Sequence, residues 1–407
     1  MNPPAPPAST SRPLRLLLLQ AQTPFDPTSG AAQSMRQIAE LLAGAGVAVH
    51  ALTTSLCEGD VSIPPAELMR AAGATVTPLP TAGRGPARWR AHRAGVDYEV
   101  MQADPTRKHS WEHLVGANYD RRLASLTREF SPHVVLTFGG DPTDTARRRR
   151  LRQAGARVVF ALHNLAYLDR RPDEVDTFLA PTRFLAARYE AAWSTSVATL
   201  PPPIDPAHCL APHREPVCIA YLNPEPAKGA ALVAHLAARL GRERPDVPLL
   251  VVGGRAPATD LIAIGQKLGL TLADLPNLLQ VAPTARPADW LGACRVLLAP
   301  SIVAEAAGRI PIEAMANGVV PLVSDRGGLP EMVGDAGLVL PLPPSLTLAA
   351  PWDVPEAAVD LWWRTLVSLL DDEPAWRNRS AVAEERSATF FPNALASRYL
   401  AFFNAKS

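Results

Sequence analysis

The sequence predicts an α/β protein with two domains, each built on a parallel sheet that helices cover on both faces. The chain has 407 residues, a length that suits two domains of ordinary size. It is 47% hydrophobic and 19% charged, so each domain can bury a large core. Short apolar runs alternate with amphipathic segments in both halves, which is the pattern of parallel strands joined by helices. A proline-rich stretch divides the halves.

The first half, residues 14–200, is expected to form one domain. The stretch 83–111 breaks its alternation, because it is polar, basic and without a period, and it is interpreted as a long loop or small insertion. Residues 1–13 are rich in Pro, Ala and Ser and are expected to be a disordered leader. The expected strands are Arg15–Leu19, Ala48–Thr53, Thr75–Pro78, Val134–Phe138, Val158–Leu162, Thr177–Ala180 and Val197–Leu200, and the expected helices are Ala31–Ala43, Ala66–Ala72, Tyr119–Phe130, Thr145–Ala154 and Thr182–Trp193.

Residues 201–216 hold six prolines, a stiff composition that cannot pair in a central strand, and are predicted to link the domains. Residues 217–387 repeat the alternation and form the second predicted domain. Its expected strands are Val217–Tyr221, Pro248–Val252, Leu278–Val281, Arg295–Ala299, Val319–Val323 and Leu338–Leu340. Its expected helices are Gly229–Arg242, Ala258–Leu268, Ala288–Ala293, Arg309–Asn317 and Gly328–Val333, then Glu356–Leu370 and Pro374–Ser387, and a last helix is expected at Pro392–Asn404.

Charge and cysteine content exclude some classes of function. The net charge is +1, which gives no reason to expect nucleic acid as a partner. The four cysteines lack metal-ligand and C-x-x-C spacing, so they are interpreted as reduced thiols of a cytoplasmic protein. The run Arg147–Arg150, with Arg152 and Arg157, is interpreted as a solvated helix face; docking on an anionic membrane surface is the alternative.

The most informative stretch is 300–334, in which seven residues separate two carboxylates, Glu305 and Glu313. Glu305 lies in the loop after an apolar run, and Glu313 lies on the second turn of the helix that begins near Gly308. A strand that feeds such a turn points backbone N–H groups and the positive helix end into a cleft. This cleft can hold an anion, with two acids nearby to bind hydroxyls. A sugar nucleotide offers both groups.

The stretch resembles the signature of the retaining family 4 glycosyltransferases. Their GT-B fold has two Rossmann-like, doubly wound parallel-sheet domains that face an interdomain cleft. The resemblance implies that the C-terminal helix, within residues 388–407, crosses back onto the first domain. The family's usual aromatic after the first Glu is missing, which implies a roomier donor-sugar pocket. The matching residues are Pro300, Ser301, Glu305, Gly308, Glu313, Ala314, Met315, Ala316, Gly318, Pro321, Gly327, Gly328, Pro330 and Glu331.

The resemblance gives the two acids their roles. Glu313 is implied to accept hydrogen bonds from both ribose hydroxyls of the donor nucleotide; a solvated helix glutamate is the alternative. Glu305 is implied to face the donor sugar, and its alternative is an acid that interacts with the helix dipole. The backbone N–H groups of Ala306, Ala307 and Gly308 are candidates to bind the sugar or the β-phosphate.

Residues 220–229 resemble the family's phosphate-gripping loop. The resemblance implies that Lys228 neutralises the diphosphate as it leaves; a surface lysine in a first helical turn is the alternative. Asn223 stands where many members carry a basic residue, and Arg309 is a candidate for the missing cation. Gly30 is implied to help a loop close over the donor phosphates, or it follows a helix cap at Thr28 or Ser29.

Two polar groups follow strands of the first half. His163 is implied to line the cleft, where it could bond a sugar hydroxyl or relay a proton; a structural histidine is equally compatible. Asp141 is a weaker acceptor-site candidate, and a turn residue is the stronger interpretation. The acid clusters 141–144 and 371–373 lack D-x-D spacing, so no essential metal ion is expected.

These features predict a retaining, metal-independent glycosyltransferase of the hexosyltransferase type, active in glycan biosynthesis in the cytoplasm. Its donor is a nucleotide-diphosphate sugar, which serves as co-substrate without a further cofactor, and its acceptor is a hydroxyl of a glycan, lipid or small molecule. Peripheral association with the inner membrane stays open, as do the base, the sugar, the acceptor and the oligomeric state. The alternatives are a catalytically silent sugar-nucleotide-binding subunit and an epimerase or phosphorylase of the same fold.

Overall fold

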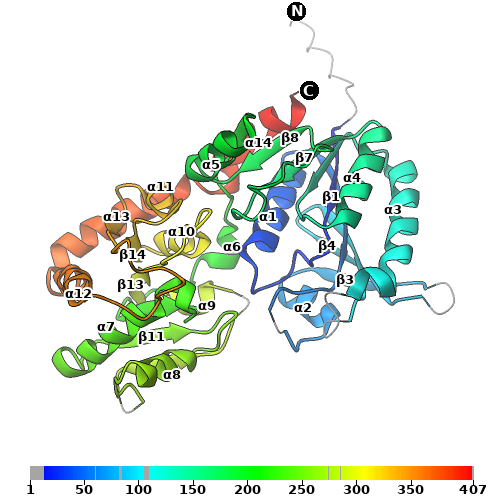
Figure 1. Ribbon diagram of the computed structural model, residues 1–407. Coiled ribbons are helices and arrows are strands. Elements are labelled where there is room, and N and C mark those ends of the chain that lie inside the picture. The colour runs from blue at the N-terminus through cyan, green and yellow to red at the C-terminus, as the bar shows by residue number, and fades with distance from the viewer. Residues whose placement is uncertain are drawn as a thin grey trace, which may run out of the picture.

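The computed structural model describes residues 13–59, 61–81, 85–104, 110–273, 275–284 and 286–405. Within these ranges the chain forms two sheets with helices packed around them (Figure 1). The predicted leader lies outside the described residues, except for Pro13. Among the helices of the described ranges, none combines the length and apolarity that crossing a membrane requires.

The first sheet has the order β3-β4-β5-β2-β1-β6-β7-β8-β9 in the described residues. Its central strand β1 is apolar at every position after Arg15 because both faces of the sheet are covered. Leu16 and Leu18 pack with α1 (Gly30–Gly44), α2 (Pro65–Ala71) and α14 (Pro392–Asn404), whereas Leu17 and Leu19 pack with α3 (Ala117–Phe130). The strands are β1 (Arg15–Leu19), β2 (Ala48–Thr54), β3 (Thr75–Leu79), β4 (Arg88–Arg93), β5 (Val96–Met101), β6 (Val134–Thr137), β7 (Arg157–Ala161), β8 (Thr177–Ala180) and β9 (Val197–Thr199). The helices are α1 (Gly30–Gly44), α2 (Pro65–Ala71), η2 (Glu112–Gly116), α3 (Ala117–Phe130), α4 (Pro142–Gln153) and α5 (Arg183–Trp193).

The prediction of a loop or insertion over 83–111 is wrong for part of that stretch. Strands β4 and β5 form an antiparallel hairpin there, and β5 joins the sheet in parallel with β2. Strand β3 then pairs antiparallel with β4, so the sheet is mixed at this edge. Val96, Tyr98 and Val100 alternate with polar residues and are buried, as a strand with one covered face requires.

The second sheet has the order β12-β11-β10-β13-β14-β15, and all of these pairs are parallel. Ile219 and Tyr221 of its central strand β10 (Cys218–Leu222) face α7 (Ala230–Glu243), α8 (Asp260–Lys267) and α12 (Glu356–Asp371), and Ala220 faces the opposite side. The elements are β10 (Cys218–Leu222), η3 (Pro226–Lys228), α7 (Ala230–Glu243), β11 (Leu249–Val252), α8 (Asp260–Lys267), β12 (Leu278–Val281), α9 (Ala288–Leu291), β13 (Cys294–Ala299), α10 (Arg309–Met315), β14 (Val320–Ser324), α11 (Leu329–Val333) and β15 (Leu338–Leu340). The short helix α6 (Pro206–Cys209) precedes this sheet.

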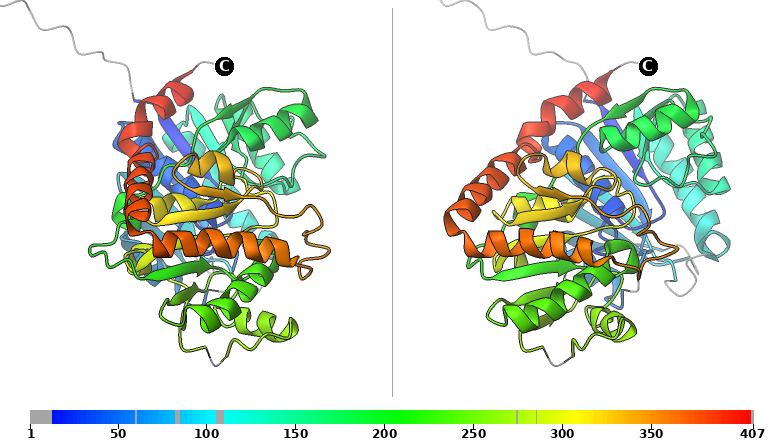
Figure 2. Two further views of the ribbon diagram at one scale, coloured as in Figure 1. Left: turned by 90° about the vertical axis from the view of Figure 1, so that its left-hand side faces the viewer. Right: turned by 60° about the vertical axis from the view of Figure 1, so that its left-hand side comes forward.

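Three C-terminal helices lead from the second sheet back to the first, as the orange and red ribbons of Figure 2 show. They are α12 (Glu356–Asp371), α13 (Glu373–Ala388) and α14 (Pro392–Asn404). Leu395, Tyr399 and Phe403 of α14 are buried in the core of the first sheet. The Tyr399 hydroxyl donates to the Pro201 carbonyl at 3.0 Å, which fixes α14 to the start of the interdomain segment.

The interpretation of the arginine run as a solvated helix face is wrong for its first two members. Arg147 and Arg148 are about 2% and 1% exposed, respectively. The Arg147 guanidinium bonds both Glu112 and Asp120, and that of Arg148 bonds Glu174 at 2.7 Å. Burial of a charge requires such partners. These two arginines therefore anchor α4 to the domain and are not available to a membrane surface.

Candidate active site

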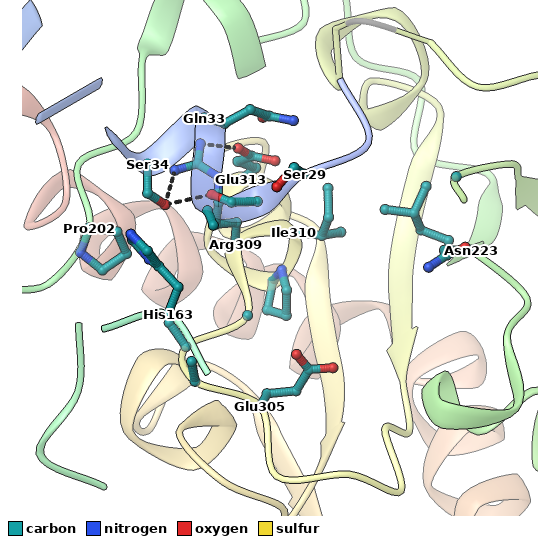
Figure 3. A pocket seen from close by; sticks show the side chains of 18 of the residues that line it. Ser29, Gln33, Ser34, His163, Pro202, Asn223, Glu305, Arg309, Ile310 and Glu313 are labelled. Atoms are coloured by element: carbon teal, nitrogen blue, oxygen red, sulfur yellow. Dashed lines mark hydrogen bonds and ion pairs between the residues drawn. The ribbon is translucent and has the colours of Figure 1, made fainter. Parts of the chain in front are cut away.

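A cavity of about 440 Å³ lies between the two sheets. Residues at the carboxyl ends of β7 and β8 line it from the first domain, and residues at the carboxyl ends of β10, β11 and β13 line it from the second. Open parallel sheets bind their ligands at this position. Helices α1 and α10 approach each other across the cavity (Figure 3).

Glu313 lies on α10 and lines this cavity. Its side chain is only 2% exposed, and its Oε1 atom accepts a hydrogen bond from Arg309 Nη2 at 2.8 Å. The two residues are four positions apart, so they share one face of the helix. A solvated helix glutamate would point into water, whereas this carboxylate lies beside Arg309 and faces Ser29 of α1's N-cap (Figure 3).

Arg309 connects the two domains. Its guanidinium donates to Ser34 Oγ at 3.2 Å and to Gln37 Oε1 at 2.9 Å, both on α1, and to the Pro203 carbonyl at 3.4 Å. Gly30, the first residue of α1, lies close by: a Cβ atom there would lie 3.5 Å from Arg309 Cδ. Ser29 Oγ caps α1 by accepting from Ala32 N. In this structure Arg309 therefore binds α1 and Glu313.

Glu305 and Lys228 form an ion pair on the second-domain side of the cavity. Glu305 Oε1 accepts from Lys228 Nζ and, at 2.6 Å, from Ser301 Oγ. Burial alone would raise the pKa of the Glu305 carboxyl, but the charge and hydrogen bond of Lys228 and the bond from Ser301 hold that pKa below its usual value. Glu305 is therefore ionised at neutral pH.

The backbone around this ion pair is fixed by close contacts. Lys228 ends the short helix η3, and Gly229 follows with φ +75°, so Lys228 precedes α7 and does not lie in its first turn. A Cβ on Gly229 would lie 2.1 Å from the Pro300 carbonyl oxygen. The Gly328 N–H donates to the Glu305 carbonyl at 2.7 Å, and a Cβ on Gly327 would lie 2.3 Å from that oxygen. Glycines at these positions allow the loops to meet.

His163 follows β7 and lines the same cavity, beside Pro202 and Arg309 (Figure 3). Its ring packs edge-on against Phe138, with centroids 5.3 Å apart. Its Nε2 atom is buried and has no hydrogen-bond partner in the described residues. Burial and the nearby Arg309 charge lower the pKa of His163 to about 4. The imidazole is therefore neutral at physiological pH and can bond a hydroxyl.

We expect His163 to stay neutral where an ordinary histidine titrates. In spectra of protein with ¹³C-labelled histidine, the signal that His163→Gln removes should not shift between about pH 8 and pH 5. Between pH 6.5 and about 4 the unfolded chain binds more protons at this residue than the folded chain does. The free energy of unfolding therefore decreases as the pH is lowered through this window, and His163→Gln should reduce that decrease. A midpoint near pH 6.5 for this signal would contradict the assignment.

Asn223 takes a structural position at the end of β10. Its φ is +61°, a conformation that asparagine tolerates better than most side chains. Its Oδ1 accepts from the Ala256 N–H at 2.9 Å, and its Nδ2 donates to Glu225 Oε2 at 3.0 Å. The amide thus joins the loop after β10 to the loop after β11.

The small residues after Glu305 also line the cavity. Ala306 is half-buried and Ala307 is buried, and Gly308 has φ +84°. A Cβ on Gly308 would lie 2.4 Å from Leu329 Cδ2, so this glycine serves internal packing as well as any approach of a ligand. Asp141, by contrast, is exposed at the N-cap of α4 and does not line the cavity.

Two residues form contacts across the cleft that the sequence did not indicate. Arg255, in the loop after β11, lines the cavity and pairs with Glu58 of the first domain at 2.7 Å. Glu331 of α11 accepts the N–H groups of Arg183 and Phe184 at 2.8 and 3.1 Å, and these begin α5 of the first domain. The position of Arg255 directly after Gly253-Gly254 at a strand's carboxyl end was the available signal.

In the described part of the chain, no group of three or more His, Cys, Asp or Glu side chains is placed to hold an ion.

Comparison with solved structures defines the fold. The chain resembles sucrose-phosphate synthase from Thermosynechococcus elongatus with a TM-score of 0.64 at 19% identity, over 96% of this chain and 98% of that chain. It resembles Anabaena HepE in complex with UDP and glucose with a TM-score of 0.65 at 14% identity, over 97% and 100% of the chains. It resembles the catalytic domain of starch synthase IV from Arabidopsis thaliana, bound to ADP and acarbose, with a TM-score of 0.66 at 13% identity, over 96% of this chain and 100% of that chain. The protein has the GT-B fold of glycosyltransferases.

Sequence comparison links part of the second half of the chain to a known family. Residues 205–344 match the family described as Glycosyl transferases group 1. Over 108 residues the chain is 36% identical to alpha-maltose-1-phosphate synthase of Mycolicibacterium smegmatis, which is 25% of this chain and 27% of that protein. The chain thus aligns with about a quarter of that relative's length. The segment that matches the glycosyl transferases group 1 family contributes Glu305, Glu313 and Lys228 to the cavity.

Proposed function

We propose that this protein is a retaining glycosyltransferase that moves a sugar from a nucleoside diphosphate to an acceptor hydroxyl. The arrangement of Glu305, Glu313 and Lys228 around one interdomain cavity carries the proposal. Two carboxylates suit the hydroxyls of a ribose and a sugar, and a lysine suits a diphosphate. The relatives support the donor class, because HepE was solved with UDP and glucose and starch synthase IV with ADP.

In this proposal Glu313 binds the ribose and Glu305 orients the donor sugar. Arg309 holds the Glu313 carboxylate in one orientation, and Lys228 with Ser301 holds that of Glu305. Both acids are therefore positioned before the ligand enters, which lowers the entropic cost of binding. We expect the neutral His163, which lines the same cavity, to bond a hydroxyl of the sugar or the acceptor.

The transfer breaks one bond and forms one bond at the anomeric carbon. The acceptor oxygen attacks from the face on which the diphosphate departs, so the configuration is retained. The electron pair of the breaking C–O bond goes to the phosphate oxygen, which then takes the proton of the acceptor hydroxyl. Lys228 stabilises the charge that develops on the leaving diphosphate. With this lysine beside the leaving group, we expect the transfer to proceed without a divalent ion.

A thermal-shift screen against UDP, GDP, ADP and dTDP sugars tests the proposal. A ligand at a hundred times its dissociation constant stabilises the protein by about 2.7 kcal/mol, enough to identify the base. Turnover on an acceptor panel should persist in excess EDTA, and NMR of the product should show the donor's anomeric configuration. Lack of stabilisation by every nucleotide sugar, an inverted product, or loss of turnover with EDTA would each contradict a named part of the proposal.

The same experiments separate the alternatives. Binding of a nucleotide sugar without turnover on any acceptor indicates a silent binding subunit. Product formation with inorganic phosphate and not with an alcohol indicates a phosphorylase. Conversion of the sugar nucleotide in the absence of any acceptor indicates an epimerase.

A further inference from the structure

Arg255 lines the cavity and carries a positive charge to which the proposed function assigns no role. It follows Gly253 and Gly254 at the carboxyl end of β11. Its guanidinium donates to Glu58 Oε1 at 2.7 Å across the cleft and to Glu225 Oε2 at 3.1 Å within its own domain. Its side chain is 37% exposed, so solvent and ligands can reach it.

The loop that carries Arg255 is firmly positioned. The Gly253 N–H donates to the Val281 carbonyl at 2.8 Å. Asn223 Oδ1 accepts from the N–H of Ala256, the residue after Arg255. Atoms pack closely here, because a Cβ on Gly254 would lie 2.8 Å from Asn223 Cβ. Asn223 and Arg255 also donate to the same Glu225 oxygen, so the guanidinium lies beside the loop that leads to Lys228.

The other cations of the cavity have less freedom. In the described part of its lining they are Lys228 and Arg309. Lys228 is tied to Glu305, and Arg309 is 9% exposed with acceptors on both domains. Arg255 instead holds Glu58, whose side chain is 46% exposed. An ion pair between exposed side chains contributes about 0–1 kcal/mol, so Arg255 can exchange its partner at little cost.

We propose that Arg255 is a second cation that binds the donor's diphosphate, exchanging Glu58 for a phosphate oxygen when the nucleotide enters. This assignment rests on the proposed function. A diphosphate carries more negative charge than Lys228 can neutralise while it is paired with Glu305. The planar guanidinium matches phosphate oxygens with two parallel N–H groups. Asn223 is then a positioning residue, because its amide fixes the loop that carries Arg255.

Calorimetry on the full chain with Arg255→Gln tests the assignment. The probes are UDP, ADP, GDP and dTDP, and the nucleoside of whichever base binds, measured by ligand-detected NMR. We expect the affinity for the diphosphate to fall about 10- to 50-fold and that for the nucleoside to stay within about twofold. Arg255→Lys should recover part of the loss because it keeps the charge. Arg377→Gln, on a side chain 74% exposed, is the matched control.

Glu58→Gln distinguishes the effect of losing the Arg255 charge from the effect of losing the ion pair between Arg255 and Glu58. It removes the negative charge that competes for Arg255 but leaves Arg255, so the diphosphate should bind equally well or more tightly. A loss in Glu58→Gln as large as in Arg255→Gln would overturn the assignment, as would equal losses for diphosphate and nucleoside in Arg255→Gln. Wild-type protein that binds none of the four diphosphates overturns the proposed function and this assignment together, whereas wild-type binding with unchanged Arg255→Gln overturns this assignment alone.

Discussion

Glu313→Gln is expected to weaken binding of the nucleoside diphosphate by about 10- to 100-fold. A hydrogen bond to a charged group contributes about 1.5–3 kcal/mol, and the amide replaces one acceptor oxygen with a donor that meets a ribose hydroxyl less well. Isothermal titration calorimetry with the nucleoside diphosphate whose base the thermal-shift screen identifies measures the change in affinity. Glu356→Gln, an exposed residue at the start of α12, is the matched control.

The Glu313 prediction needs a second variant, because this carboxylate also neutralises buried Arg309. Removing one partner of a buried ion pair is destabilising, so the unfolding temperature of Glu313→Gln should fall too. Arg309→Gln breaks the same pair but keeps the carboxylate. If Glu313 contacts the ribose, Arg309→Gln should lose clearly less affinity. Equal losses in both variants would assign the effect to the ion pair, and unchanged affinity in Glu313→Gln would refute the ribose role.

Lys228→Gln should lower kcat by about 100- to 1000-fold, with a smaller change in KM. A positioned group that stabilises charge developing in the transition state contributes about 2.7–4 kcal/mol, and most of this appears in the chemical step. Steady-state kinetics with the best donor and acceptor measure the split between kcat and KM. Lys267→Gln is the control, since that lysine lies over Trp352 and does not line the cavity.

Lys228→Gln also carries a prediction for pH. Lys228 is one of the groups that hold the pKa of Glu305 down against burial, so that pKa should rise when the lysine is lost. The residual activity of the variant should then decline at a higher pH on the acid side than wild-type activity does. A parallel loss of kcat in Lys267→Gln, or an acid limb that does not move in Lys228→Gln, would count against the role of Lys228.

Much of the fold follows from local sequence patterns. Runs such as Arg15–Leu19 are apolar at every position after the first, which is possible only where both faces of a sheet are covered. The same reasoning did not predict the hairpin β4–β5, because β4 has the polar sequence Arg-Trp-Arg-Ala-His-Arg. This segment forms a strand because it pairs with β5. Strand propensity in such a segment depends on its neighbours more than on its own residues.

The candidate site was predictable where one short stretch of chain carries it. Glu305 and Glu313 share a single loop and helix, and the structure places both on the same cavity. The ion pairs of Arg147, Arg148 and Arg255 were not predictable, because their carboxylate partners lie in other segments of the chain. A sequence shows a charge, but its burial or exposure is decided by partners that only the tertiary structure brings near.

Glu331 gives the molecule a shared helix cap with a mechanical consequence. The first two N–H groups of α5 donate to the Glu331 carboxylate, which belongs to the other half of the chain. Beside them, Thr182 Oγ1 donates to the Ala306 carbonyl at 2.6 Å. Any hinge motion that parts the halves must uncap that helix and release the backbone beside Glu305 in one event. Opening of the cleft and loosening of the loop that carries Glu305 are thereby a single equilibrium, and deuterium uptake at the Arg183 and Phe184 amides measures it.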